Sequence, residues 1–188
     1  MEDKMFINDL KHFSLSEGEG EGGRGMTQKY FLQLAEYNVW ANDIVFSWFD
    51  KISDEQWNQY LVSSFESIGA TALHVAGSES IWLDRLNKVD SPIWLPAVFK
   101  GNKNEIINLW KKASADLKVF IENLDETKME SILRFTRLNG ITYEMPHYQV
   151  LAHVFNHSSY HRGQLVTLLR QVEFTGVSST DLSGFFSK

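Results

Sequence analysis

Apolar residues recur at helical spacing in four segments of the chain, approximately 28–51, 67–87, 104–124 and 146–172. In each segment they recur three or four positions apart, which places them on one face of an α-helix and is typical of helices that pack around a shared core. The pattern therefore predicts an all-α protein built as a four-helix bundle.

A short β-hairpin is predicted between the third and fourth helices. Asn139-Gly140 separates two β-prone runs, 129–137 and 141–145. An Asn-Gly pair accepts the positive φ angles of a tight turn, so it is a strong hairpin signal. Pro146 then stands in the first turn of the last helix, where proline is tolerated.

The first 25 residues differ in composition from the rest. Residues 16–25 are rich in Gly and Glu, which predicts a flexible N-terminal extension over 1–25, followed by one helical domain over 26–188. A length of 188 residues suits a single domain with a substantial core.

Composition narrows the possible functions. The chain has no cysteine, which excludes disulfides, thiolate ligands and a cysteine nucleophile, and fits a cytoplasmic location. Its formal net charge of −6 argues against nucleic acid as a partner. No apolar run approaches the roughly 18 residues of a membrane span, so no membrane partner is expected.

The last helix carries three of the six histidines, His153, His157 and His161, at i, i+4 spacing. Two imidazoles four residues apart are neighbours on a helix and can reach one divalent ion. At about 100° per residue, His161 falls in the apolar stripe and His157 at its edge, whereas His153 lies further toward the polar face. We therefore expect His157 and His161 to be ligands, and His153 to be a surface or supporting group.

A third ligand must come from another part of the chain, and His74, Glu79 and His147 are the candidates. Glu79 interrupts the apolar face of the second helix, and His74 lies to one side of that face among small residues. These small neighbours leave room for a ligand, but they also permit close helix packing. His147 is about two and a half turns before His157 and is not expected to reach it.

Asn38 is a polar residue in the apolar stripe of the first helix, so it requires a hydrogen-bond partner. That partner is either the backbone or a polar group in the core.

Three motifs resemble the DinB (damage-inducible, YfiT-like) family: YNVWAN at 37–42, LHVAGSESIW at 73–82 and HVFNHSSYHRGQ at 153–164, with a weaker match, STD, at 179–181. The resemblance covers about residues 27–182. It implies a four-helix bundle of up-down-down-up topology, often dimeric. It also implies a divalent metal held by one histidine of the second helix and two of the fourth, which fall on His74, His157 and His161.

Some relatives in this family resemble enzymes that use low-molecular-weight thiols, including transferases of bacillithiol or mycothiol. A three-histidine site leaves a position for water or substrate. Such a site can support a thiol S-transferase or a hydrolase, whereas a fourth ligand from Glu79 or His153 would favour a metal that only stabilises the bundle. Imidazole suits zinc and nickel, which are the expected metals.

Glu79, Tyr160 and Gln164 are the candidate catalytic groups beside this metal, and a small molecule such as a low-molecular-weight thiol is the expected substrate. The resemblance, with the many aromatic residues, also predicts a homodimer.

Overall fold

The structure is a computed structural model that describes residues 27–187. The predicted N-terminal extension, 1–25, lies outside the described residues. The secondary-structure elements are, in order, α1 (Gln28–Phe49), α2 (Asp54–Asn58), α3 (Ile68–Leu86), α4 (Leu95–Val98), α5 (Lys103–Glu122), the 3₁₀ turn η1 (Glu126–Lys128), β1 (Ile132–Thr136), β2 (Thr142–Pro146), α6 (His147–Gln171) and α7 (Leu182–Phe186).

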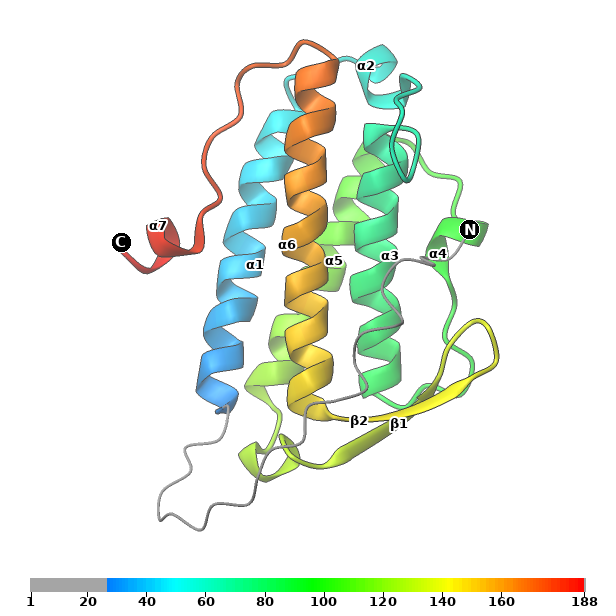
Figure 1. Cartoon of the computed structure of the whole chain (residues 1–188), viewed down its shortest axis with the longest axis vertical. Helices are drawn as coiled ribbons and strands as arrows, with labels where there is room; N and C mark the ends of the chain where they lie inside the picture. The colour runs from blue at the N-terminus through cyan, green and yellow to red at the C-terminus, as the bar shows by residue number, and fades with distance from the viewer. Residues whose placement is uncertain (1–26, 188) are drawn as a thin grey trace.

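The four long helices α1, α3, α5 and α6 form a bundle in which α3 contacts α5 and α6, and α1 contacts the same two helices. In Figure 1, α1 and α6 run in one direction and α3 and α5 in the other. The connection between the parallel helices α3 and α5 is the long crossover that contains α4. The predicted up-down-down-up bundle is therefore confirmed.

Polar caps mark where the long helices begin. Thr27, Ser67 and Asn102 each accept a hydrogen bond from a backbone N–H of the first turn of α1, α3 and α5. These N–H groups have no partner inside the helix, so a cap stabilises the helix start. The expected helix boundaries agree with the structure to within about three residues. Pro146, placed by the sequence in the first turn of α6, is instead the residue that precedes it.

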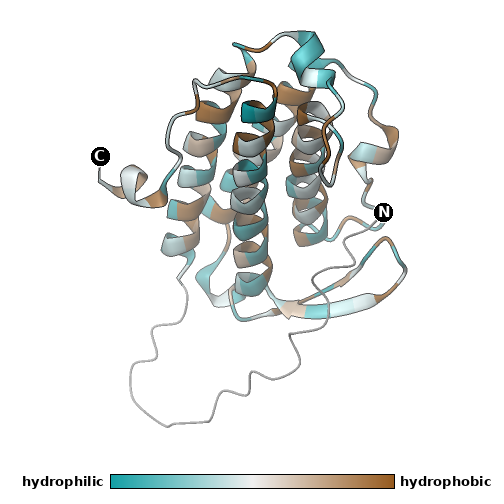
Figure 2. Cartoon of the chain, turned by 45° about the horizontal axis from the view of Figure 1, so that its top comes forward, coloured by the Kyte–Doolittle hydropathy of each residue, from teal (hydrophilic) through white to brown (hydrophobic). Residues whose placement is uncertain are grey.

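The apolar core is divided into two clusters, one toward each end of the bundle. On every long helix, a stretch with buried polar residues separates the positions of one cluster from those of the other. Figure 2 shows hydrophilic (teal) and hydrophobic (brown) residues alternating along each helix. The buried residues that form this polar layer are Asn38, Asn42, Glu79, Ser114, Ser158 and Arg162.

Glu79 is the centre of the polar layer, and its side chain is fully buried, at 0 % exposure. Its Oε2 accepts a hydrogen bond from Ser114 Oγ at 2.6 Å. Its Oε1 accepts from Asn38 Nδ2 at 2.9 Å, Ser158 Oγ at 2.9 Å and Trp110 Nε1 at 3.2 Å. A carboxylate taken out of water needs such partners, and here they come from α1, α5 and α6.

Arg162 balances the charge of Glu79 through two asparagines. The amide nitrogens of Asn38 and Asn42 face Glu79 Oε1, while their amide oxygens accept hydrogen bonds from Arg162 Nη1. The side chain of Asn38 therefore bonds to polar groups in the core, Glu79 and Arg162, which was one of the two alternatives that the sequence left open.

The hairpin closes the end of the bundle where α6 begins. β1 and β2 are antiparallel, with Phe135 opposite Tyr143. Gly140 has φ +80°, and its N–H donates to Arg137 O, so the turn spans residues 137–140 with the left-handed residue supplied by glycine.

Three short helices, α2, α4 and α7, were not expected from the sequence. Each has five residues or fewer, too short for helical periodicity to show. The clearest local signal among them is in α2, a capping box formed by Ser53 and Gln56. None of the described helices combines the length and the apolar character needed to cross a membrane.

We expect Asn38→Leu to lower the free energy of unfolding by about 3 kcal/mol or more, because it removes a hydrogen bond from each member of a buried opposite-charge pair. Urea unfolding followed by circular dichroism measures this change. The control is Asn108→Leu on an exposed position of α5, expected to stay within about 0.5 kcal/mol of the wild type. Equal stability of the two variants would show that the polar layer contributes little.

Candidate metal centre

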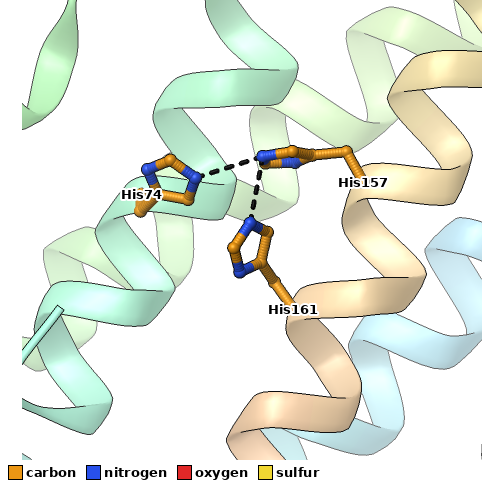
Figure 3. Close-up of side chains that lie close together, drawn as sticks. All are labelled: His74, His157 and His161. Atoms are coloured by element: carbon orange, nitrogen blue, oxygen red, sulfur yellow. Dashed lines mark hydrogen bonds between the residues drawn. The ribbon is translucent and has the colours of Figure 1, made fainter. Parts of the chain in front are cut away.

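Three histidines from two neighbouring helices converge on one point. His74 projects from α3, and His157 and His161 project from successive turns of α6 (Figure 3). His157 Nε2 lies 3.1 Å from His74 Nε2 and 3.0 Å from His161 Nε2. Among the residues that the structure describes, these three form the one group of histidine and acidic side chains whose ligand atoms all lie within 4.8 Å of one another.

The spacing of these nitrogens fits a shared divalent ion. Two imidazole nitrogens bound to one tetrahedral zinc at the usual bond length are about 3.3 Å apart. Without a cation, the three facing nitrogens can interact only through hydrogen bonds that use their own ring protons. A cation, in contrast, accepts a lone pair from each of the three nitrogens. The donor set thus suits zinc, nickel and related metals.

Gln164 holds His161 in the form that a metal requires. His161 Nδ1 lies 2.7 Å from Gln164 Oε1, an atom that only accepts hydrogen bonds. The proton of neutral His161 is therefore on Nδ1, and the lone pair of Nε2 faces the other two histidines. Gln164 Nε2 in turn donates to Tyr160 Oη at 3.3 Å, and the ring of Tyr160 meets His161 edge-on.

Burial keeps two of the histidines neutral. It lowers the pKa of His74 to about 3, with the charge of His161 as a second cause. Burial also lowers the pKa of His157 to about 2, and the charges of His161, His74 and His153 are the further causes, in that order. Because a metal binds only the unprotonated imidazole, both side chains are ready to bind at neutral pH.

Two aromatic residues from loops flank His74. The ring of Phe65, in the loop before α3, stacks on His74 at 4.0 Å with an interplanar angle of 23°. The edge of Trp94, beside α4, meets the same ring at 5.6 Å. A Cβ on Gly77 would lie 2.5 Å from Pro96 Cδ, so this glycine is what allows α4 to approach α3 so closely.

The other candidates lie apart from the three converging nitrogens. Glu79 belongs to the polar layer, where both carboxylate oxygens accept hydrogen bonds. His147 is buried near the hairpin, with its Nδ1 2.7 Å from Ser131 O. His153 is exposed, and its ring lies 5.9 Å from that of His157. Tyr160 and Gln164 are the predicted catalytic candidates that contact the cluster.

Comparison with known proteins agrees with the motifs and the bundle. The family model described as "DinB family" matches residues 26–180. The chain belongs to the DinB family. A curated relative, "Protein DinB" of Bacillus subtilis (strain 168), is 25 % identical over 152 residues, which cover 77 % of this chain and 87 % of the relative.

A solved structure shares the fold. The crystal structure of a DinB-like protein from Bacillus cereus ATCC 10987 superposes with a TM-score of 0.65 and 21 % identity, covering 82 % of this chain and 99 % of that one. Together with the family match, this similarity identifies the helical bundle as a DinB bundle.

Sequence reasoning missed Phe65 and Trp94 as neighbours of the site. Both residues lie in loops, where no periodicity indicates which way a side chain points. Arg162, which follows His161 in the chain, lies in the polar layer, where it donates to Asn38 Oδ1.

The histidine pKa values predict how the stability of the metal-free protein depends on pH. In the unfolded chain His74 and His157 bind protons below about pH 6.5, while in the folded protein they stay neutral down to about pH 3 and 2. Because the unfolded state binds more protons in this window, the free energy of unfolding falls as pH is lowered from 6.5 toward 3, by up to about 1.4 kcal/mol per pH unit for each histidine.

Chemical denaturation of chelator-treated protein between pH 7.5 and 4.5 measures this slope. The double variant His74→Gln, His157→Gln serves as the reference, since its carboxylates titrate as in the wild type. Parallel stability curves for the two proteins would contradict the prediction.

Proposed function

We propose that this DinB-family protein is a metal-dependent enzyme that transfers a low-molecular-weight thiol to an electrophilic small molecule. The observation that carries the proposal is that three imidazole nitrogens converge on one point. Among the described residues, no fourth histidine or acidic side chain joins this group. Structural zinc sites usually have four protein ligands, whereas catalytic sites have three and an open position.

The environment of Glu79 supports an open site. A fourth protein ligand would favour a purely structural metal, and Glu79 was one candidate for it. Its oxygens are instead engaged by Ser114, Asn38 and other residues of the polar layer, so it is not available without disrupting that layer.

A divalent ion with an open position lowers the pKa of a bound thiol or water molecule. The chain has no cysteine of its own, so the reactive sulfur must come from a cosubstrate. The resemblance to thiol-using members of the family favours this reaction over hydrolysis. In the transfer, a carbon–sulfur bond forms, the bond to the leaving group breaks, and the thiol proton is released.

Tyr160 and Gln164 are the residues that we assign to orientation and proton transfer. Gln164 links His161 to the Tyr160 hydroxyl, and Tyr160 is 46 % exposed. The phenol can therefore exchange a proton with a bound substrate and with solvent, while Gln164 keeps the imidazole of His161 oriented.

Purified protein is expected to hold about one zinc or nickel ion per chain, and His74→Ala, His157→Ala and His161→Ala are each expected to lose most of it. Elemental analysis measures the metal content, with circular dichroism to verify folding. The control is His153→Gln, one turn before His157, which should keep the metal. Full retention of metal in all three alanine variants would refute the assignment.

Gln164→Leu is expected to weaken metal binding by about tenfold to a hundredfold, because it removes the acceptor that fixes the His161 proton on Nδ1. Competition with a chromogenic zinc chelator measures the dissociation constant. Gln171→Leu, the same substitution at an exposed position near the end of α6, should bind metal as the wild type does. Equal dissociation constants for the two variants would remove Gln164 from the site.

For activity, the metal-loaded protein is expected to conjugate a thiol with 1-chloro-2,4-dinitrobenzene, in a reaction that His161→Ala abolishes. Bacillithiol, mycothiol, glutathione and coenzyme A would be compared by absorbance, beside chromogenic ester and amide substrates. Metal-dependent turnover of the esters or amides alone would instead assign a hydrolase. No turnover, with a large fall in melting temperature on chelation, would assign a structural metal.

A further inference from the structure

A second group of side chains, outside the metal ligands, begins on the inner face of the hairpin. Successive side chains of a strand alternate between its two faces, so Arg137, just past the end of β1, follows the parity of the buried residues Leu133 and Phe135. Its guanidinium carbon lies 4.4 Å from the centre of the Tyr143 ring, which stacks on Phe135 with centroids 6.0 Å apart.

The aromatic contacts continue from the hairpin to α3. Trp82 meets Phe135 edge-on at 5.0 Å. The guanidinium of Arg85 lies 4.5 Å from the centre of the Trp82 ring and 5.5 Å from that of Phe135. Stacking on aromatic faces is a favourable placement for guanidinium groups.

The same contacts reach the metal centre through α6. The ring of His153 packs edge-on against Trp82 at 5.0 Å and lies 5.9 Å from the ring of His157. The pKa of His153 is below its ordinary value, first because its ring is partly withdrawn from water and then because of the charges of Arg137 and Arg85. His153 is exposed and Arg137 half-buried, so a ligand can reach both.

The acidic side chain of the hairpin lies on its opposite face. Glu144 pairs with Arg134, whose side chain points outward, at 3.9 Å. Within residues 27–187, none of the ion pairs includes Arg137. Two arginines and an imidazole thus gather beside the histidine cluster in a chain whose formal net charge is −6.

We propose that Arg137 and His153 form a subsite that binds a carboxylate group of the substrate next to the metal centre, with the buried Arg85 adding positive charge behind it. This inference rests on the proposed function and adds the class of substrate, a short-chain carboxylic acid that bears the thiol. A guanidinium presents paired N–H donors that match a carboxylate, the imidazole adds another donor, and the Trp82 ring provides an apolar surface beside them.

The test uses the full chain loaded with cobalt(II), whose absorption shows when a thiolate binds. The probes are mercaptosuccinate, which carries two carboxylates, and 1-thioglycerol, an uncharged thiol of similar size. We expect the wild type to bind mercaptosuccinate at least about tenfold more tightly than 1-thioglycerol, as one charge-assisted interaction would give.

Arg137→Gln is expected to abolish this preference and to leave binding of 1-thioglycerol unchanged. The matched control is Arg134→Gln, on the outer face of the same strand, which should keep the wild-type preference. Equal affinity of the wild type for the two thiols, or equal losses in the two arginine variants, would overturn the proposal.

Failure of the proposed function is distinguished by a measurement without metal. If the wild type binds no cobalt, or no thiolate absorption appears, the proposed function fails, and the subsite is tested by titrating the metal-free protein with succinate. A saturable shift of the Trp82 indole resonance in NMR spectra, lost in Arg137→Gln and kept in Arg134→Gln, supports the subsite. Absence of saturation in the wild type overturns it.

Discussion

The buried carboxylate of Glu79 is the constraint around which the bundle is organised. A carboxylate in an apolar interior is strongly destabilising unless hydrogen bonds and an opposite charge compensate it. Here donors come from α1, α5 and α6, and the charge of Arg162 is relayed through Asn38 and Asn42. Because each helix must supply its donor at one height, the layer favours a single register of the four helices. An apolar layer at the same height would tolerate sliding and rotation far better.

This register also positions the three converging histidines. On α6, Ser158 directly follows His157, and Arg162 directly follows His161. Because adjacent residues of a helix point about 100° apart, the two histidines face the cluster while Ser158 and Arg162 face the polar layer. On α3, Glu79 lies five residues after His74. The contacts that hold α3 and α6 together in the core therefore also set how far His74 lies from the other two histidines. Outside the core, Gln164 determines which nitrogen of His161 carries the proton.

Each histidine of the cluster has different neighbours. Phe65 and Trp94, both carried by loops, lie against His74. Tyr160 and Gln164 flank His161, and His153 leads toward the arginines at the hairpin. The bundle and its polar layer thus hold the three histidines in place, while the loops, the hairpin and the outer face of α6 provide the other groups around them. In such an arrangement, relatives can share a bundle and differ in chemistry.

The sequence by itself determined what depends on spacing within one element. Helical periodicity located the four long helices, Asn139-Gly140 located the hairpin, and the i, i+4 spacing put His157 and His161 side by side. His74 was assigned through the family motif, because its helical phase alone favoured close helix packing over a ligand. Glu79 was recognised as a polar residue on an apolar face, but its role stayed open between metal ligand and catalytic group.

Only the tertiary structure decided which residues of different elements meet. The bonds from Asn38 and Ser158 to Glu79, the stacking of Phe65 on His74, and the approach of Arg137 and Arg85 to His153 join residues far apart in the chain or carried by loops. A helix or strand repeats at a known interval, so its own geometry follows from local spacing. How two elements are rotated and shifted against each other depends on the packing of all their side chains at once, and no local pattern encodes it.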